Sequence, residues 1–283
     1  MSNLPHRLRF FGYSLLLHSL YCSALTADPV NGGIALIDLP VQDTAPQVQY
    51  HGSPVLLLKT AGHWQAVVGI AVHTPPGSEH LTLLPSGQLI EFNVGHRNYP
   101  EQHIHLKNQQ QVSPNSATLQ RINQELSEEI RLFATFDASL SPNALNMTRL
   151  PVSSHQVLSE FGLQRFFNGE PRAPHSGLDL KASEGEPIYS PVAGRVLMSK
   201  KLFFNGNTVM LDEGQGVVSM FCHLSKIEVY PGQHLNAGAL LGYAGHTGRA
   251  TGPHLHWSVS LNGVRVNPRL LLDPSLNNQL EPH

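Results

Sequence analysis

The clearest alternation of hydrophobic and polar residues follows Gly252 and Pro253, near the C-terminal end of the chain. Side chains two positions apart on a β-strand point to the same face, so this segment predicts a strand with two different faces. One face is apolar, and its residues are Leu255, Trp257, Val259 and Leu261. The other is polar, and its residues are His254, His256, Ser258 and Ser260. Two histidines on one face could bind a metal, provided that another part of the chain supplies a third ligand.

Short apolar segments bounded by Gly and Pro recur on both sides of the middle of the chain, and they predict β-strands. In the first part, the predicted strands are 32–37, 54–58, 64–70, 81–84 and 88–94, with a hairpin turn at Pro85-Ser86-Gly87. In the second part, the predicted strands are 187–189, 194–198, 208–211 and 217–223. The pattern therefore predicts two β-rich regions, over about 31–108 and from about 150 onward.

A helical pattern separates the two β-rich regions. Apolar residues recur there at spacings of three and four, which predicts an amphipathic helix. These residues are Leu119, Ile122, Leu126, Ile130 and Phe133. Ser116 is the expected N-cap, and Pro142 marks the end of this connector. We interpret the apolar stripe as core packing.

The composition limits the possible classes of protein. With 283 residues, of which 41% are hydrophobic and 13% charged, the chain can form one large or two medium domains. Its formal net charge of −2 provides no long-range attraction to nucleic acid, so no nucleic-acid partner is expected.

The first residues are typical of a secretory signal peptide. Arg7 and Arg9 precede an apolar run over 10–20, and Ala27 offers a small residue at a cleavage site. The run is shorter than the roughly 20 apolar residues of a spanning helix, although an uncleaved membrane anchor is the alternative. We expect an exported protein with no stable membrane insertion after cleavage.

A second group of candidate metal ligands lies at His175 and Asp179. Gly177 and Pro174 argue against a helix here, so we expect His175 at the end of a loop and Asp179 on a strand. The leucines on either side of Asp179 would then pack inward. Neutral imidazole and carboxylate are both ligands that zinc accepts.

A third group lies at Cys222 and His223. Strand alternation places Ser219, Phe221 and His223 on one face and Cys222 on the opposite face. We therefore expect Cys222 to be a small buried hydrophobic residue. Its use beside His223 as a zinc thiolate or a nucleophile is disfavoured.

Two other histidine positions could be mistaken for ligands. His103 and His105 form a second His-x-His pair, but no Asp or Cys lies near them in the sequence. We interpret them as residues of an edge strand. His246 follows Gly245 in a turn, and we expect it at the rim of the site, with substrate contact as the less favoured alternative.

The order and spacing of the three groups resemble those of the lysostaphin-type (LytM/M23) zinc metallopeptidases. The matching segments are 175–179, 220–225 and 252–257, with further matches at 165–169 and 206–209. The resemblance covers about residues 145–275. The N-terminal β-rich region and its helix are similar, more weakly, to those of Gram-negative members.

The resemblance implies a mostly β fold. It comprises a C-terminal lysostaphin-like antiparallel β-sheet peptidase domain, preceded by a small β-rich N-terminal domain and an amphipathic connector helix. The implied divisions are a signal peptide at 1–27, the N-terminal domain at 28–112, the helical connector at 113–144, the peptidase domain at 145–275 and a flexible tail at 276–283.

The resemblance also implies a role for each residue of the site. The implied Zn²⁺ ligands are His175, Asp179 and His256. The implied catalytic residues are His223 and His254, of which one accepts a proton and the other stabilises negative charge, in an order left open. The implied substrate-binding residues are Arg165 and Asn168. The implied substrate is the peptide cross-link between peptidoglycan stem peptides, in the periplasm.

Two alternatives without catalysis remain. Some relatives have lost zinc ligands and activate other cell-wall hydrolases, although all five chemical positions are filled here. A peptidoglycan-binding scaffold is the other alternative. We also expect the N-terminal domain to restrain the enzyme, because every residue of the chemistry lies outside it.

Overall fold

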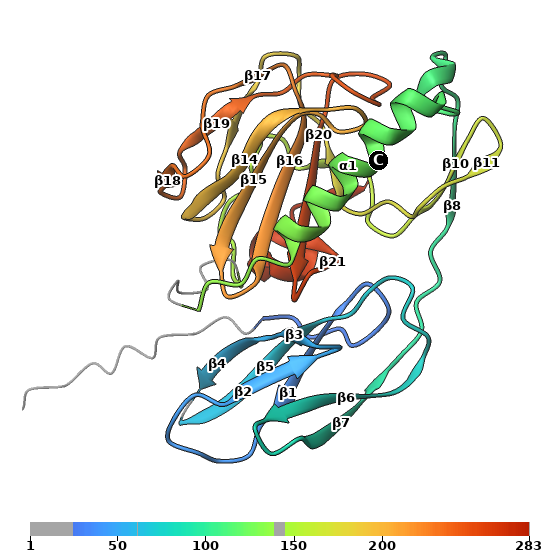
Figure 1. Ribbon diagram of the computed structural model, residues 1–283. Helices are drawn as coiled ribbons and strands as arrows, with labels where there is room; N and C mark the ends of the chain where they lie inside the picture. The colour runs from blue at the N-terminus through green and yellow to red at the C-terminus, as the bar shows by residue number, and fades with distance from the viewer. Residues whose placement is uncertain (1–24, 61, 139–144, 283) are drawn as a thin grey trace, which may run out of the picture.

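The chain is described by a computed structural model over residues 25–60, 62–138 and 145–282, and it is mostly β. Figure 1 shows a smaller N-terminal unit below a larger C-terminal one, with the long helix α1 against one face of the larger unit. No helix in the described ranges is long and apolar enough to cross a membrane. The predicted signal peptide lies outside these ranges except for its last residues, 25–27, as does Pro142.

The N-terminal unit consists of two small sheets packed face to face. In spatial order, the first contains β1 (Ile34–Asp38), β5 (His63–Gly69) and β4 (Leu56–Thr60). The second contains β3 (Ser53–Pro54), β2 (Gln47–Tyr50), β6 (Gly77–Leu84) and β7 (Gln88–Val94). Val48, Val68 and Leu81 lie in the core between them. The apolar pattern predicted most of these strands, but it missed β2 because that segment is half polar.

The C-terminal unit is built on one large sheet. Its strands, in spatial order, are β18 (His234–Leu235), β14 (Gly194–Leu202), β15 (Gly206–Gly214), β16 (Val217–Leu224), β20 (Leu255–Leu261), β12 (Leu178–Leu180), β9 (Gln156–Ser159) and β22 (Glu281–Pro282), with β21 (Val264–Val266) paired to β20. A smaller sheet beside it contains β13 (Pro187–Tyr189), β19 (Leu240–Tyr243) and β17 (Lys226–Ile227). The short helices are η1 (Gln109–Gln111), η2 (Pro268–Leu271) and α2 (Pro274–Asn277).

Helix α1 (Ser116–Phe133) begins one residue earlier than the predicted cap implies. The side chain of Asn115, not Ser116, accepts a hydrogen bond from the Thr118 amide at 2.9 Å. Asn115 has extended backbone angles, which let its side chain turn back onto the first turn of the helix. The prediction of Ser116 as the N-cap is therefore wrong by one position.

The apolar stripe of α1 is only partly buried, so its interpretation as core packing is half wrong. Ile122 and Phe133 are 5% and 1% exposed, whereas Leu126 and Ile130 are 43% and 65% exposed. The C-terminal end of the helix packs on β14, β15 and β16 through Leu132 and Phe133. From Ile122 to Glu129, α1 lines a cavity, and Leu126 on this stretch is therefore left partly exposed.

The end of the chain is ordered in the described residues, which corrects the predicted flexible tail at 276–283. Leu276 and Leu280 are buried in the main core, and β22 pairs with β9 in parallel. The sequence analysis did not identify these two leucines as core residues, because the residues between them are polar.

The N-terminal and C-terminal units are joined at several places, including a strand pairing and a side-chain contact. β8 (Glu101–Ile104) pairs in parallel with β10 (Gln164–Phe167), which also pairs with β11 (Glu170–Pro171). On the other side, the Asn262 side chain accepts a hydrogen bond from the Gly69 amide at 2.6 Å and donates one to the Gly69 carbonyl at 3.0 Å. The units are therefore connected by backbone pairing as well as by packing.

Candidate metal centre and active site

The two faces of β20 differ as the sequence predicted. Its apolar residues, Leu255, Trp257, Val259 and Leu261, are fully buried in the main core. Its polar face turns to the other side of the sheet, where β12 runs antiparallel to it with Asp179 opposite His256. Directly opposed residues on neighbouring strands share a face, so this register brings the carboxylate beside the imidazole.

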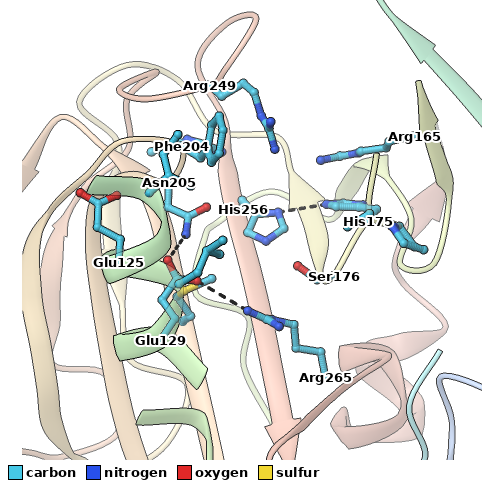
Figure 2. A pocket seen from close by; sticks show the side chains of 16 residues that line it. Glu125, Glu129, Arg165, His175, Ser176, Phe204, Asn205, Arg249, His256 and Arg265 are labelled. Atoms are coloured by element: carbon cyan, nitrogen blue, oxygen red, sulfur yellow. Dashed lines mark hydrogen bonds and ion pairs between the residues drawn. The ribbon is translucent and has the colours of Figure 1, made fainter. Parts of the chain in front are cut away.

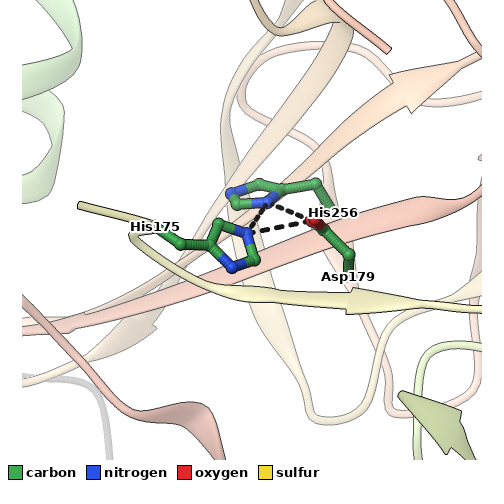
Figure 3. A group of neighbouring side chains, drawn as sticks. All are labelled: His175, Asp179 and His256. Atoms are coloured by element: carbon green, nitrogen blue, oxygen red, sulfur yellow. Dashed lines mark hydrogen bonds and ion pairs between the residues drawn. The ribbon is translucent and has the colours of Figure 1, made fainter. Parts of the chain in front are cut away.

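Three potential ligand atoms form a compact triangle (Figure 3). His256 Nδ1 lies 2.7 Å from Asp179 Oδ1, and His175 Nε2 lies 3.0 Å from each of them. His175 comes from the loop before β12, as predicted, and all three residues are buried. Two imidazole nitrogens and a carboxylate oxygen at this separation fit around one metal ion and leave a side open for water.

The remaining ring nitrogens hold both histidines in the orientation of metal ligands. His175 Nδ1 donates a hydrogen bond to the Glu160 carbonyl at 2.6 Å, which leaves Nε2 as an acceptor. His256 Nε2 lies 2.8 Å from the Ser258 hydroxyl, which leaves Nδ1 free to bind. Burial lowers the pKa of His256 to about 4, so its imidazole is neutral at neutral pH, as a ligand must be.

Asp179 is kept ionised by its neighbours. Its second oxygen accepts a hydrogen bond from Arg165 Nη2 at 2.6 Å, and Arg165 Nε donates to Gln102 Oε1 at 3.0 Å. Burial alone would raise the pKa of Asp179, but His175, His256 and Arg165 together hold it well below its usual value. Arg165 was predicted to contact substrate; here it uses its donors on the site itself.

Two further histidines face the same site. His223 Nδ1 donates to the Thr247 carbonyl at 2.8 Å, and His254 Nδ1 donates to the Gly252 carbonyl at 2.9 Å. Both rings therefore keep an Nε2 lone pair, and their centroids are 4.9 Å apart. Burial, then the charges of His254 and His256, lower the pKa of His223 to about 3, so its imidazole is neutral at neutral pH.

Comparison with known proteins identifies this arrangement. The family model of peptidase family M23 matches residues 173–268, and that of the peptidase family M23 N-terminal domain matches residues 27–97. A solved Pseudomonas aeruginosa structure assigned to peptidase M23 is 40% identical, with a TM-score of 0.68, and the match covers 86% of this chain and 94% of that one. The chain belongs to peptidase family M23.

The curated relatives ShyA and Mpg each match less than half of this M23 chain. Peptidoglycan DD-endopeptidase ShyA of Vibrio cholerae is 38% identical over 121 residues, which are 42% of this chain and 28% of ShyA. DD-carboxypeptidase/endopeptidase Mpg of Neisseria meningitidis is 36% identical over 94 residues, which are 33% of this chain and 22% of Mpg. The matched part thus spans about a quarter of these relatives' length.

A β-bulge in β16 corrects the predicted position of His223. Val209 pairs with Phe221 and Asn207 pairs with Leu224, so Cys222 and His223 together lie opposite one residue of β15. His223 has a positive φ of 64°, and it lines the same cavity as His256 instead of sharing the core face with Phe221. Strict alternation could not predict this, because the extra residue reverses the side of the strand.

Cys222 is a buried, unmodified thiol, as predicted. It packs among Met220, Met210 and Leu202 beneath the end of α1. Burial raises the pKa of the Cys222 thiol well above its usual value, which argues against a thiolate ligand or nucleophile.

A cavity of about 240 Å³ opens beside the M23 histidines. Figure 2 shows α1 along one side of the cavity, with Glu129 facing Arg265 across it. Glu129 accepts a hydrogen bond from Asn205 at 2.9 Å and lies 3.6 Å from Arg265. Among the described residues that line this cavity, none comes from the N-terminal sandwich, and α1 is the element of the N-terminal half that lines it.

The other predicted positions lie away from the triangle. Asn168 is held in a turn, where its side chain exchanges hydrogen bonds with the backbone of Leu106 at 2.8 and 3.0 Å, and it does not line the cavity. His103 lies on β8, an edge strand as expected. His246 is an exposed loop residue whose Nδ1 is 2.7 Å from Glu184.

Sequence reasoning missed three residues that shape the site. Gln102 was placed in the N-terminal domain and gave no sign of reaching Arg165 across β8 and β10. Ser258 stands two residues after His256 on the same strand face, a spacing that could have identified it as the partner of the ring. Arg249 lies in the loop before the His-x-His pair, where a basic residue close to the motif was the available signal.

Proposed function

We propose that the chain is a zinc-dependent endopeptidase that hydrolyses peptide cross-links of peptidoglycan in the periplasm. The observation that supports this best is the triangle of His175, Asp179 and His256, with the free Nε2 atoms of two other histidines beside it. A His₂Asp set with one open position is the ligand pattern of catalytic zinc rather than structural zinc.

Each residue of the chain has a separate task in this proposal. His175, Asp179 and His256 hold the zinc, and bound zinc supplies a Lewis acid that lowers the pKa of water and polarises a carbonyl group. Arg165 orients Asp179 through its 2.6 Å hydrogen bond. The Glu160 carbonyl fixes the tautomer of His175, and the Ser258 hydroxyl orients the ring of His256.

His223 and His254 perform the proton transfers. Because both have Nδ1 engaged by a backbone carbonyl, Nε2 is the atom that accepts the proton of the attacking water. The other histidine, once protonated at Nε2, donates a hydrogen bond to the developing oxyanion. The two rings are close enough to exchange these tasks, so we assign them as a pair.

The names of two relatives support the substrate. ShyA is named a peptidoglycan DD-endopeptidase and Mpg a DD-carboxypeptidase/endopeptidase. The M23 family model, over residues 173–268, covers all five histidine and aspartate residues of this site. We therefore assign the peptidase to residues 145–275 and the stem peptides of peptidoglycan as its substrate. Export by residues 1–27 would bring it to the periplasm.

The non-enzymatic alternatives are less well supported. An activator or scaffold would not need the hydrogen bonds that hold His175 and His256 in the orientation of ligands, nor two further histidines whose Nδ1 atoms are engaged by backbone carbonyls. The site retains all of these features.

Digestion of purified peptidoglycan tests the proposal. The zinc-loaded chain is expected to release monomeric muropeptides from cross-linked dimers, as detected by mass spectrometry, and removal of zinc should abolish this. Free amino groups at the cut identify the bond. A zinc-loaded, folded chain that leaves every cross-link intact would rule out the proposed activity.

A further inference from the structure

Arg249 is an arginine of the active-site cavity whose side chain makes no hydrogen bond or ion pair within the described parts of the chain. Its guanidinium carbon lies 4.4 Å from the ring centroid of Phe167 and 4.1 Å from that of Phe204. Its backbone amide donates to the Phe204 carbonyl at 2.7 Å, which anchors the residue at its other end. The side chain is thus held in place without using its N–H donors.

Packing against two aromatic rings leaves the N–H donors of the guanidinium without an oxygen acceptor among the described residues. A cation–π contact is made with the face of an aromatic ring, and the guanidinium retains five N–H donors for a ligand. Figure 2 shows Arg249 and Arg165 reaching from different sides toward the space above His256. A planar guanidinium group with unused donors can bind a carboxylate, which accepts two parallel hydrogen bonds from it.

The surroundings of Arg249 favour an anion. Burial, then the charges of Arg165 and Arg172, lower the pKa of Arg249 to about 10, so it remains charged at neutral pH. The other cavity arginines have acidic partners: Arg165 pairs with Asp179, and Arg265 lies 3.6 Å from Glu129. Arg249 is left as the arginine of the cavity without a counter-ion among the described residues.

We propose that Arg249 binds a free carboxylate of the substrate peptide close to the bond that is cut. This rests on the proposed function, since it adds a specificity contact to the same site. The loop of Arg249 leads directly into Gly252 and His254, so a carboxylate on Arg249 would fix the peptide relative to the catalytic histidines. The preferred substrates are then peptides with a free carboxylate on a residue adjoining the scissile amide, and neutralising that carboxylate as an amide should weaken binding.

The test compares binding of two small peptides, N-acetyl-D-alanyl-D-alanine and its C-terminal amide. The full-length, zinc-loaded protein is titrated with each by NMR before any turnover, as wild type, Arg249→Gln, Arg249→Lys and Arg131→Gln. Arg131 is an exposed arginine of α1 outside the cavity, so its variant removes the same charge elsewhere. The fold of each variant is checked by its thermal midpoint and zinc content.

The wild type and Arg131→Gln should bind the carboxylate about tenfold or more tightly than the amide, as expected for a charge-assisted hydrogen bond. The Arg249→Gln variant should bind the carboxylate peptide about 10- to 100-fold more weakly than the wild type, with little change in its affinity for the amide peptide. The affinity of Arg249→Lys for the carboxylate peptide should lie between those of the wild type and Arg249→Gln. Equal weakening of both peptides would assign Arg249 to holding Phe167 and Phe204 together, and would overturn the proposal. Absence of any preference in the wild type, including absence of binding, would also overturn it.

The same variants separate this inference from the proposed function. If cross-linked muropeptides are not hydrolysed but the carboxylate preference is present and depends on Arg249, the endopeptidase assignment fails and the carboxylate site remains. If hydrolysis occurs at equal rates on free and amidated cross-links, and Arg249→Gln slows both equally, the enzyme remains and the carboxylate site fails.

Discussion

The chain contains two His-x-His pairs whose surroundings differ completely. His103, on edge strand β8, has a 63% exposed side chain, stacks on Phe166 and lies 3.0 Å from Glu101 two residues away. His256, on the central strand β20, is buried between Asp179 of the next strand and Ser258 of its own. The His-x-His spacing is the same, so the neighbouring strands, and not the motif, decide which pair can hold a metal.

The largest effect should come from removing a ligand. Asp179→Ala or His175→Ala should reduce bound zinc from about one per chain to a small fraction, because two remaining ligands bind zinc weakly. His103→Ala, the matched change at the other pair, should keep its zinc. Zinc per chain, measured by elemental mass spectrometry after dialysis, decides between them. Equal zinc loss in His103→Ala would remove the distinction between the two pairs.

The next effect separates metal binding from catalysis within the second pair. His254→Ala, and likewise His223→Ala, should keep most of the zinc and lose turnover by roughly 100-fold or more, as for a general acid–base group. Cross-link hydrolysis is measured together with zinc content. A His254→Ala protein as free of metal as His175→Ala would show that our division of roles is wrong.

A smaller effect is expected from the hydroxyl group that orients His256. Ser258→Ala removes the 2.8 Å contact to Nε2 and should weaken zinc affinity by about 10- to 100-fold, as with other partners of ligand histidines. Ser260→Ala is the control, since Ser260 is equally buried on the same face and its hydroxyl points to the Phe133 carbonyl. Competition with a chromogenic chelator gives the affinities. Identical values for both variants would exclude an orienting role for Ser258.

The smallest expected effect concerns restraint by the N-terminal half. Glu125 accepts a hydrogen bond from the Phe203 amide at 2.7 Å, and Glu128 pairs with Lys200, so both tie α1 to the side of the cavity. If α1 favours the closed position by about 1.4 kcal/mol, roughly nine in ten molecules are held back, and Glu125→Ala with Glu128→Ala should raise turnover by up to about tenfold. Rates are measured on soluble cross-linked muropeptides, so that attachment to the cell wall has no influence.

A chain that begins near residue 145 provides a second comparison with the mature chain on the same substrate. Faster turnover by the shorter chain would support restraint. Equal or slower turnover by a folded, zinc-loaded short chain, together with unchanged turnover of the α1 double variant, would exclude it. Glu91→Ala, on β7 outside the cavity lining, controls for loss of an acidic residue.

Much of this architecture follows from local pattern. The two faces of β20 were predicted because its apolar and polar residues alternate without interruption over Leu255–Leu261. The loop before β12 was predicted because Pro174 and Gly177 exclude a helix there. These features depend on neighbouring residues in the sequence, so a sequence reading can identify them.

Features that depend on distant partners were missed. The bulge at Cys222 and His223 arises from the register between two strands, and no residue of β16 alone indicates it. The exposure of Leu126 reflects a cavity formed by segments far along the chain. The contact of Gln102 with Arg165 requires a parallel pairing between residues more than sixty positions apart.

The parallel pairing of β8 with β10 has a consequence for protein engineering. Recombination of peptidases from different relatives normally uses the segment between domains as the crossover point. In this chain, a crossover after β8 combines one parent's Gln102 with the other parent's Arg165. Because Arg165 also bonds Asp179, the orientation of Asp179 then depends on which parent supplied the N-terminal half. Chimaeras should consequently retain activity more often when the crossover lies before Glu101, so that β8, β10 and the metal ligands are inherited together.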